Sequence, residues 1–365
     1  MPTKVLCVVG TRPNVIKSAP LMRELRKYPE LFETKLVHTG QHYDRNLSEL
    51  FFGDLGMSEP DINLGVGSGS HAEQTAKVMI AMEATALRER NDLFVVFGDV
   101  NSTMATAIVA AKLCVKLAHV ESGLRSHDRT MPEEINRIVT DHLSDYLFVT
   151  ESSGLDNLKK EGIPDEKVHF TGNIMIDSLL ATLHVVQRSK ILTRLGLTSR
   201  DYAVMTLHRP SNVDDPRTLA GILEAVVRIS KRTPVVFPCH PRTRHNLARF
   251  GLDAHIGSSL IVTEPLGYTD FCRLVYDSAF VLTDSGGIQE ETTYLGIPCI
   301  TMRNSTERPV TVTVGTNVLT GTDAAKITSA VDAVLDGRPR QAGIPDLWDG
   351  HTAERTVDVL RRLQA

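Results

Sequence analysis

The sequence lacks a large excess of charge of either sign. Its 365 residues carry 40 lysines and arginines against 44 aspartates and glutamates, so the formal net charge is -4. Proteins that bind nucleic acid or an anionic membrane over a broad surface are usually strongly basic. We therefore expect no nucleic-acid partner and no membrane partner, and any anion-binding site has to be local.

Long apolar runs and paired cysteines are also missing. The apolar segment near the N-terminus, residues 5–9, is too short for a membrane span or a signal peptide, which predicts a cytoplasmic protein. The five cysteines lie far apart and form no CxxC pair, which argues against a disulfide framework and against structural zinc. We expect most of them to be small core residues, and we expect no metal site.

Several motifs of common enzyme classes are absent. The sequence contains no GxxxxGK[ST], HExxH or GxSxG segment, which argues against a P-loop enzyme, a zincin and a serine hydrolase. Gly65, Gly67 and Gly69 look like part of a dinucleotide fingerprint, but they follow no clear strand and lack the GxGxxG spacing. We therefore expect no nicotinamide cofactor.

The composition is that of a globular protein, with 42% hydrophobic and 23% charged residues, and the length favours two domains. Short β-branched runs alternate with longer amphipathic stretches, which predicts an α/β fold with parallel sheets. The expected strands cover residues 4–10, 35–40, 93–98, 117–121, 146–150, 168–171, 202–207, 235–239, 260–263, 280–283 and 299–302.

We place the domain border near residue 172, ahead of an expected apolar helix over residues 174–186. The first domain then covers residues 1–172 and the second covers residues 173–350. The amphipathic tail, residues 351–365, forms a C-terminal helix that either covers the second domain or crosses back to the first.

The segment Gly10-Thr11-Arg12-Pro13-Asn14 leaves the first expected strand and opens a helix, with Lys17 one turn further on. A glycine turn, free N–H groups at a helix start and two nearby cations suit a phosphate or a pyrophosphate. A simple strand-to-helix turn with solvated charges would have the same sequence pattern.

A second segment, residues 284–291, leaves a later strand in the same way. Its paired glycines, Gly286 and Gly287, let the backbone approach an anion closely, and Ser285 adds a hydroxyl donor. Glu291 could accept hydrogen bonds from ribose hydroxyls, and Arg308 further along could add a cation.

Histidines and carboxylates also lie at strand ends. His208 and His240 each follow a strand of the second half. Cations at these positions could hold a leaving pyrophosphate. A lone histidine, however, is more often a core or capping residue. Asp99 and Glu121 end neighbouring strands, and Glu133 opens the helix that carries Arg137. Such carboxylates suit proton transfer at a sugar carbon, but acidic residues also cap helices, and Glu134 could do only that.

Taken in order, these segments resemble the UDP-N-acetylglucosamine 2-epimerase family. The resemblance runs from residue 4 to about residue 323 and rests on the segments GTRPN, TGQHYD, GDVNST, HVESGLR, MPEEINR, GNIMID, LHRPSNVDD, EPLGY, TDSGGIQEE and TERP. It implies two Rossmann-like domains of glycosyltransferase-B (GT-B) type with the active site in the interdomain cleft. It also implies a UDP-sugar substrate, no cofactor and a homodimer.

The resemblance implies reversible conversion of UDP-N-acetylglucosamine to UDP-N-acetylmannosamine, by elimination of UDP, formation of 2-acetamidoglucal and return of UDP. It makes Asp99, Glu121 and Glu133 the candidate acid/base carboxylates, assisted by Lys17, Arg137 and His208. The positions that match UDP-binding residues are Arg12, His208, Ser285, Gly286, Gly287, Glu291 and Arg308.

The sequence departs from the family pattern in two places. Asn14 replaces the glutamate that usually follows GTRP. Some relatives bind an activating second substrate near a segment that begins with Gln-His, but here Gln41-His42 are followed by the different residues Tyr43-Asp44-Arg45. Three other activities stay open: a hydrolysing epimerase that releases UDP and N-acetylmannosamine, an epimerase of a related sugar such as a diacetamido uronic acid, and a glycosyltransferase. A silent nucleotide-sugar sensor would have lost the three carboxylates, which are present.

Overall fold

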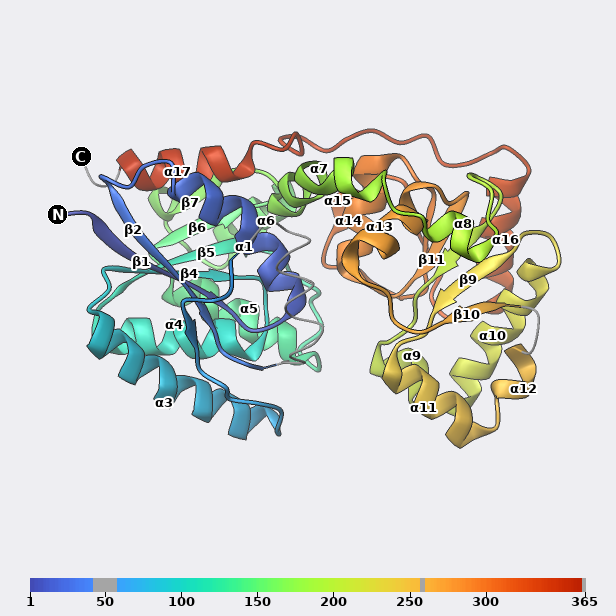
Figure 1. The fold of residues 1–365 in the computed structure, drawn as a ribbon, viewed down its shortest axis with the longest axis horizontal. Coiled ribbons are helices and arrows are strands. Elements are labelled where there is room, and N and C mark those ends of the chain that lie inside the picture. The colour runs from blue at the N-terminus through green and yellow to red at the C-terminus, as the bar shows by residue number, and fades with distance from the viewer. Residues whose placement is uncertain (42–57, 257–259, 363–365) are drawn as a thin grey trace. The chain divides into compact units, whose positions relative to one another are not determined.

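The computed structural model describes residues 1–41, 58–256 and 260–362, and the chain forms two compact units (Figure 1). The first unit comprises Met1–Ala181 and Asp346–Ala365, and the second comprises Thr182–Pro345. Every helix in the described ranges is too short or too polar to cross a membrane.

The first unit contains a parallel sheet of seven strands in the order β3-β2-β1-β4-β5-β6-β7. This order runs outward in both directions from the central pair β1 and β4, as in doubly wound dinucleotide-binding folds. The strands are β1 (Thr3–Val9), β2 (Phe32–His38), β3 (Ile62–Asn63), β4 (Leu93–Phe97), β5 (Lys116–Ser122), β6 (Tyr146–Val149) and β7 (Val168–Phe170).

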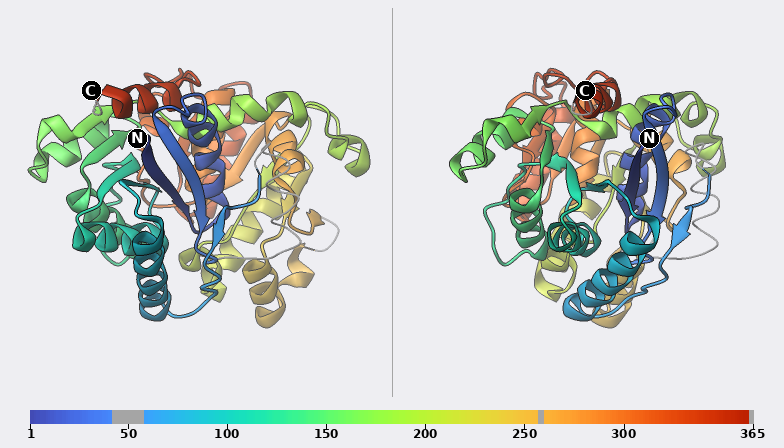
Figure 2. Two further views of the ribbon diagram at one scale, coloured as in Figure 1. Left: turned by 60° about the vertical axis from the view of Figure 1, so that its left-hand side comes forward. Right: turned by 90° about the vertical axis from the view of Figure 1, so that its left-hand side faces the viewer.

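Helices cover both faces of this sheet. Leu6 and Val8 of β1 pack in one cluster with Met82, while Cys7 between them is buried on the opposite face, because successive side chains of a strand alternate. Helices α3 (His71–Glu89), α4 (Asn101–Leu113) and α5 (Pro132–Leu143) cover one face, and α1 (Arg12–Leu25) and α17 (Thr352–Arg362) cover the other (Figure 2). The remaining helices that begin in this unit are α6 (Ser152–Lys160), the short 3-10 turn η1 (Asp165–Lys167) and α7 (Ile174–Val186).

The second unit repeats the architecture with a six-stranded parallel sheet in the order β10-β9-β8-β11-β12-β13. Its strands are β8 (Ala203–Met205), β9 (Val235–Pro238), β10 (Ile261–Thr263), β11 (Phe280–Thr283), β12 (Cys299–Thr301) and β13 (Asn317–Leu319). Its helices are α8 (Ile191–Leu195), α9 (Pro210–Val213), α10 (Pro216–Ser230), α11 (Pro241–Phe250), α12 (Asp253–Ile256), α13 (Tyr268–Tyr276), α14 (Gly286–Leu295), α15 (Pro309–Thr313) and α16 (Ala324–Leu335).

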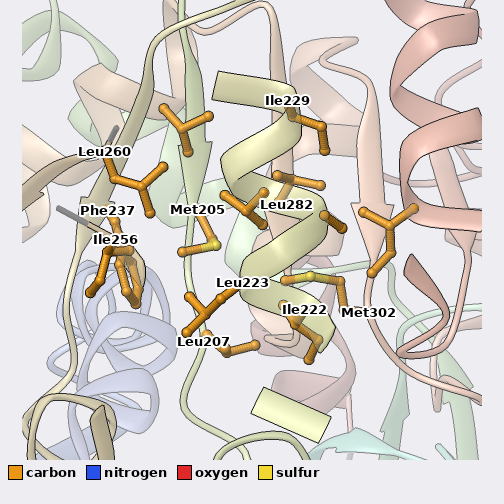
Figure 3. Packing of buried hydrophobic residues seen from close by; sticks show 14 of the residues in the cluster. Met205, Leu207, Ile222, Leu223, Ile229, Phe237, Ile256, Leu260, Leu282 and Met302 are labelled. Atoms are coloured by element: carbon orange, nitrogen blue, oxygen red, sulfur yellow. The ribbon is translucent and has the colours of Figure 1, made fainter. Parts of the chain in front are cut away.

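The core of the second unit lies between α10 and the sheet. Ile222 and Leu223 of α10 pack against Met205, Phe237 and Leu282 of three neighbouring strands (Figure 3). These side chains are almost completely buried. Such packing makes the sheet a rigid support for the loops at its carboxyl edge.

The predicted fold class is confirmed, and every expected strand is present within a few residues. Two strands were not expected, β3 and β13, and both lie at the edge of a sheet. They are only two and three residues long, so neither leaves an apolar run that periodicity could detect.

The two units divide between Ala181 and Thr182, inside α7 rather than ahead of it at residue 172. The first half of α7 is bonded to the first unit, because Ser178 Oγ donates to the carbonyl of Ile16 at 2.7 Å and Asp177 accepts from the N–H of Ala353 at 2.8 Å. Of the two placements left open for the C-terminal helix, the structure has the one in which α17 belongs to the first unit.

Candidate active site

Each sheet has a point at which the strand order reverses, between β1 and β4 in the first unit and between β8 and β11 in the second. Ligands of open α/β sheets bind outside the carboxyl ends of the strands at this point. The segments singled out from the sequence follow these four strands: residues 10–14 follow β1, residues 98–99 follow β4, residues 206–209 follow β8 and residues 284–285 follow β11.

Asn14 fixes the turn between β1 and α1. Its Oδ1 accepts hydrogen bonds from the N–H and the Oγ1 of Thr11 at 3.2 and 2.9 Å, and its Nδ2 donates to the carbonyl of Phe97 at 2.9 Å. The side chain is buried. A carboxylate could accept the first two hydrogen bonds but could not donate the third. Asparagine in place of glutamate therefore adds a hydrogen bond that connects the end of β1 to the end of β4.

Glu121 and Lys17 form a buried ion pair at this edge of the first sheet. Glu121 has a φ of 75°, in the left-handed region that non-glycine residues rarely adopt, and such strain is typical of functional positions. Gly98 leaves room for the pair, because a Cβ there would lie 3.1 Å from Glu121 Oε2 and 3.3 Å from Lys17 Nζ. Lys17 thus contacts Glu121, while Arg12 lies exposed at the start of α1.

Asp99 has a cationic partner of its own, since Arg137 Nη1 donates to Asp99 Oδ2 at 2.5 Å. Arg137 is buried and its Nη2 also donates to Glu134 at 2.8 Å. Glu134 accepts from the N–H of Ser126 at 2.8 Å as well. Burial opposes ionisation of Glu134, but these Ser126 and Arg137 hydrogen bonds outweigh it and lower its pKa. Glu134 is therefore an anchor for Arg137 and not only a capping residue.

Glu133 contrasts with its neighbour. It lies half-buried in the first turn of α5, and within the ranges that the structure describes it forms neither a hydrogen bond nor an ion pair. The structure thus brings Lys17 to Glu121 and Arg137 to Asp99, but it pairs Glu133 with neither cation.

In the second unit, Asp284 connects the ends of β8 and β11. It is fully buried, and its Oδ2 accepts from the N–H groups of His208 and Arg209 at 2.9 and 2.8 Å. His208 Nδ1 lies 2.8 Å from Asp284 Oδ1. Although burial acts to raise the pKa of Asp284, His208 and the backbone N–H groups lower it overall. Asp284 therefore fixes His208, whose ring lies 5.8 Å from that of His240 between centroids.

The N-terminus of α14 is surrounded by features that favour an anion. Ser285 is its N-cap, and a Cβ at Gly286 would lie 2.7 Å from Arg308 Nη1, so the glycine permits the close approach of that guanidinium group. At Gly287 a Cβ would meet open space. The Glu307 carboxylate lies beside Arg308 too, with Oε1 3.0 Å from the Cβ position at Gly286, and compensates part of this positive charge. The free N–H groups of the helix start beside a guanidinium group still suit a phosphate group.

Arg308 belongs to a buried cluster of charges around Glu307. The Glu307 carboxylate accepts from Arg303 Nη2 at 2.8 Å and from Arg308 Nη1 at 2.9 Å, and Arg209 Nη2 lies 3.4 Å away. Burial alone would raise the pKa of Glu307, but Arg308, Arg303 and Arg209 hold it far below its usual range. Arg308 also pairs with Glu290 at 2.8 Å. One carboxylate thus orients three cations.

Glu291 lies in the same helix and is buried. Burial raises its pKa to about 7, the neighbouring charge of Glu290 adds to this, and the Tyr268 hydroxyl, 3.4 Å from Oε1, acts in the opposite direction. Ionised and protonated forms are therefore both populated near neutral pH.

Asp284 and Glu307 were missed by sequence reasoning as site residues, although both lie inside the segments TDSGGIQEE and TERP. Residues 42–45, where the sequence departs from the activator segment of some relatives, lie outside the described residues. No group of three or more histidine, cysteine, aspartate or glutamate side chains among the described residues is placed to hold a metal ion.

A family model described as UDP-N-acetylglucosamine 2-epimerase matches residues 23–361. The chain belongs to this family. The predictions of the family and of an enzyme are therefore confirmed.

Individual members are similar over the whole length. A UDP-N-acetylglucosamine 2-epimerase of Methanocaldococcus jannaschii is 40% identical over 364 residues, which cover 98% of each chain. A Pseudomonas aeruginosa protein, UDP-2,3-diacetamido-2,3-dideoxy-D-glucuronate 2-epimerase, is also 40% identical, over 99% of this chain and 100% of its own.

Solved structures agree with the fold. The Methanocaldococcus jannaschii UDP-GlcNAc 2-epimerase in complex with UDP-GlcNAc and UDP has a TM-score of 0.91 at 39% identity and covers 99% of this chain and 100% of its own. Phytolacca americana UGT2, complexed with UDP-2fluoro-glucose and pterostilbene, has a TM-score of 0.58 at 12% identity over 100% of this chain and 96% of its own, which shows likeness of fold alone. The predicted GT-B type of the two Rossmann-like units is confirmed.

Proposed function

We propose that this family member interconverts UDP-N-acetylglucosamine and UDP-N-acetylmannosamine without releasing the free sugar. The observation that carries the proposal is the pair of carboxylate–cation contacts at the edge of the first sheet, Glu121 with Lys17 and Asp99 with Arg137. The support from the second unit is the start of α14 beside Arg308, whose geometry suits an anion. The relative bound to UDP-GlcNAc and UDP is consistent with this substrate.

The binding roles follow from the chemistry of each group. The β-phosphate of UDP would bind at the N-terminus of α14, held by Ser285 and Arg308 and flanked by His208. The ribose hydroxyls would donate to Glu291 in its ionised form. These groups also meet the negative charge that develops on UDP when its bond to the sugar breaks.

The reaction needs an elimination because the C2 proton has no neighbouring carbonyl group to acidify it. A carboxylate of the first unit takes the proton from C2, the C1–C2 double bond forms, and the electron pair of the C1–O bond leaves with UDP. In the return step a proton is delivered to the other face of C2 and the UDP oxygen attacks C1. General acid/base catalysis contributes about 10²–10⁴-fold, and positioning and electrostatic stabilisation supply the rest. Asp99, Glu121 and Glu133 are the proposed acid/base groups.

The test is proton NMR of UDP-N-acetylglucosamine incubated with the purified protein in deuterated water. The proposal predicts growth of UDP-N-acetylmannosamine that carries deuterium at C2. Free N-acetylmannosamine together with UDP would instead show the hydrolysing reaction, and an unchanged spectrum would contradict both. The variant Glu121→Gln is expected to lose the reaction, whereas Glu33→Gln, on an exposed position of β2, serves as the matched control.

The alternative candidate substrate is a UDP-linked diacetamido uronic acid. The observation in its favour is the Pseudomonas aeruginosa relative, which is as identical to this chain as the Methanocaldococcus jannaschii relative. The same NMR assay with both UDP-sugars decides between them through the ratio of their kcat/KM values. If kcat/KM is higher for the uronic acid than for UDP-N-acetylglucosamine, the uronic acid becomes the proposed substrate.

We also propose that the protein is a homodimer. Helix α3 exposes the large apolar side chains of Ile80 and Leu87, with 70% and 63% of their surfaces accessible, which supports an interface on this helix. Light scattering of the purified protein should give twice the chain mass of 40.2 kDa, and Ile80→Glu should shift it toward the monomer. The predicted cytoplasmic location stays a prediction.

A further inference from the structure

A buried histidine–aspartate pair lies behind the two carboxylate–cation contacts of the first unit. His119 is in β5 and Asp141 is in α5, and neither side chain is exposed. His119 Nδ1 lies 2.6 Å from Asp141 Oδ1, and His119 Nε2 lies 2.8 Å from the carbonyl oxygen of Gly98. The two residues therefore bridge from α5 through β5 to the end of β4.

The histidine end of this bridge holds the peptide that leads into Asp99. The carbonyl of Gly98 belongs to the peptide bond between Gly98 and Asp99, so a hydrogen bond to it fixes the plane of that peptide. The N–H of Gly98 is held as well, because it donates to the carbonyl of Val120 at 3.1 Å. Gly98 has a φ of +61°, which glycine adopts without steric cost, so these hydrogen bonds select one of several conformations open to it.

The aspartate end holds the backbone that follows Glu121. Asp141 Oδ2 accepts from the N–H of Gly123 at 3.1 Å and pairs with Arg125 Nη1 at 2.7 Å. Gly123, like Glu121, has a positive φ, +79°. One carboxylate therefore stabilises the left-handed segment that carries Glu121, while its histidine partner stabilises the segment that carries Asp99.

The ionisation of Asp141 follows from its hydrogen-bond partners. Both ring nitrogens of His119 are engaged, one with the carbonyl oxygen of Gly98 and the other with the carboxylate of Asp141. Burial acts to raise the pKa of Asp141, but the charges and hydrogen bonds of His119 and Arg125 lower it below its usual range. The buried carboxylate of Asp141 therefore depends on His119 and Arg125, and removing either partner leaves this charge less well compensated.

We propose that His119 and Asp141 are positioning residues that set the distance and orientation between Asp99 and Glu121 for proton transfer. This inference rests on the proposed function, in which those two carboxylates act on the substrate. It assigns to the HVESGLR segment a role for its histidine that is separate from substrate contact, because His119 is buried behind the strand ends.

Two substitutions of His119 separate the two ends of the bridge. Glutamine places its amide nitrogen near the position of Nε2, so His119→Gln keeps a donor for the Gly98 carbonyl. Asparagine places its amide nitrogen near Nδ1, so His119→Asn keeps a donor for Asp141 and loses the Gly98 contact. His119→Gln therefore keeps the hydrogen bond to Gly98, and His119→Asn keeps the one to Asp141, which Arg125 and the N–H of Gly123 also hold.

We expect His119→Asn to lower kcat about 100-fold with KM changed less than about threefold, because misplacement of reacting groups affects the chemical step and not uniform binding. His119→Gln should retain at least about ten times more activity than His119→Asn. Affinity for UDP, measured by calorimetry, should stay unchanged in both, since the proposed UDP site lies in the second unit. Asp141→Asn keeps the shape of the side chain and should also lower kcat at constant KM.

The matched control is Asp145→Asn, because Asp145 directly precedes β6 and contacts the amino end of β5. Asp145 accepts from the N–H of Leu117 at 3.0 Å and pairs with Lys116 at 2.7 Å, so it also holds β5 but lies away from the carboxyl edge. It should leave kcat unchanged. Unchanged kcat in His119→Asn and Asp141→Asn, or a loss of kcat that follows the melting temperature across all four variants, would overturn the inference.

Hydrogen–deuterium exchange gives a readout that does not depend on epimerase activity. His119→Asn should speed amide exchange in residues 98–101, and Asp141→Asn should speed it in residues 121–125. Unchanged exchange in both segments would overturn the positioning role. A wild-type protein without epimerase activity would overturn the proposed function instead, and the exchange pattern would still show whether the bridge holds the two segments.

Discussion

Glu291 makes a prediction about the pH dependence of UDP binding. If its carboxylate accepts hydrogen bonds from the ribose, only the ionised form binds well. Because burial raises its pKa to about 7, protonation competes with UDP as the pH falls through neutrality. Affinity for UDP should therefore be highest above pH 7 and decrease below it. In Glu291→Gln the side chain no longer titrates, so this part of the pH dependence should disappear.

The size of the effect follows from the pKa. With a pKa of about 7, Glu291 is about one tenth protonated at pH 8 and about nine tenths protonated at pH 6. Binding that requires the ionised form is then about tenfold weaker at pH 6 than at pH 8, which corresponds to about 1.4 kcal/mol. An ordinary glutamate, with a pKa near 4.3, would give almost no change over this range.

Isothermal titration calorimetry with UDP at pH 6, 7 and 8 measures the effect. The terminal phosphate of UDP also titrates in this range, so the wild-type values are compared with Glu291→Gln, in which every other group remains. We expect the Kd ratio between pH 6 and pH 8 to be about tenfold larger in the wild type. Equal ratios in the two proteins would refute the role of the Glu291 carboxylate.

Three further substitutions test other parts of the account. Gly98→Ala places a Cβ at a φ of +61° against Glu121 and should lower the free energy of unfolding by about 1–2 kcal/mol and abolish epimerisation, measured by denaturation and NMR. Glu307→Gln leaves a cluster of guanidinium groups undercompensated and should cost about 3–5 kcal/mol, with weaker UDP binding by calorimetry. Trp348→Ala removes a buried side chain whose Nε1 donates to the carbonyl of Thr150. It should lower the free energy of unfolding, measured by chemical denaturation, by about 3–5 kcal/mol and leave UDP affinity unchanged.

The sequence was sufficient for the strands that carry continuous apolar runs and for the helix Ile174–Val186, whose bounds were predicted from its apolar composition. It was insufficient for the strands β3 and β13, which are too short to show a period. It also placed the domain border ahead of α7. The hydrogen bonds of Asp177 to α17 draw the start of that helix into the first unit, and such contacts leave no local signal.

For the site, the sequence predicted that Asp99, Glu121 and Ser285 lie at the carboxyl ends of strands, and the structure has them there. Their roles stay predictions. His119 and Glu307 were not selected, since their importance comes from partners that lie far away along the chain. Residues that act through such distant partners are therefore harder to predict than polar residues at strand ends.

The central claim is that the bond between C1 and the oxygen of UDP breaks and re-forms during each turnover. It is tested most directly with UDP-N-acetylglucosamine that carries ¹⁸O in this bridging position, followed by phosphorus NMR. The account predicts that the label moves into the non-bridging positions of the β-phosphate at a rate at least equal to that of epimerisation. Epimerisation with the label still entirely in the bridge would contradict it.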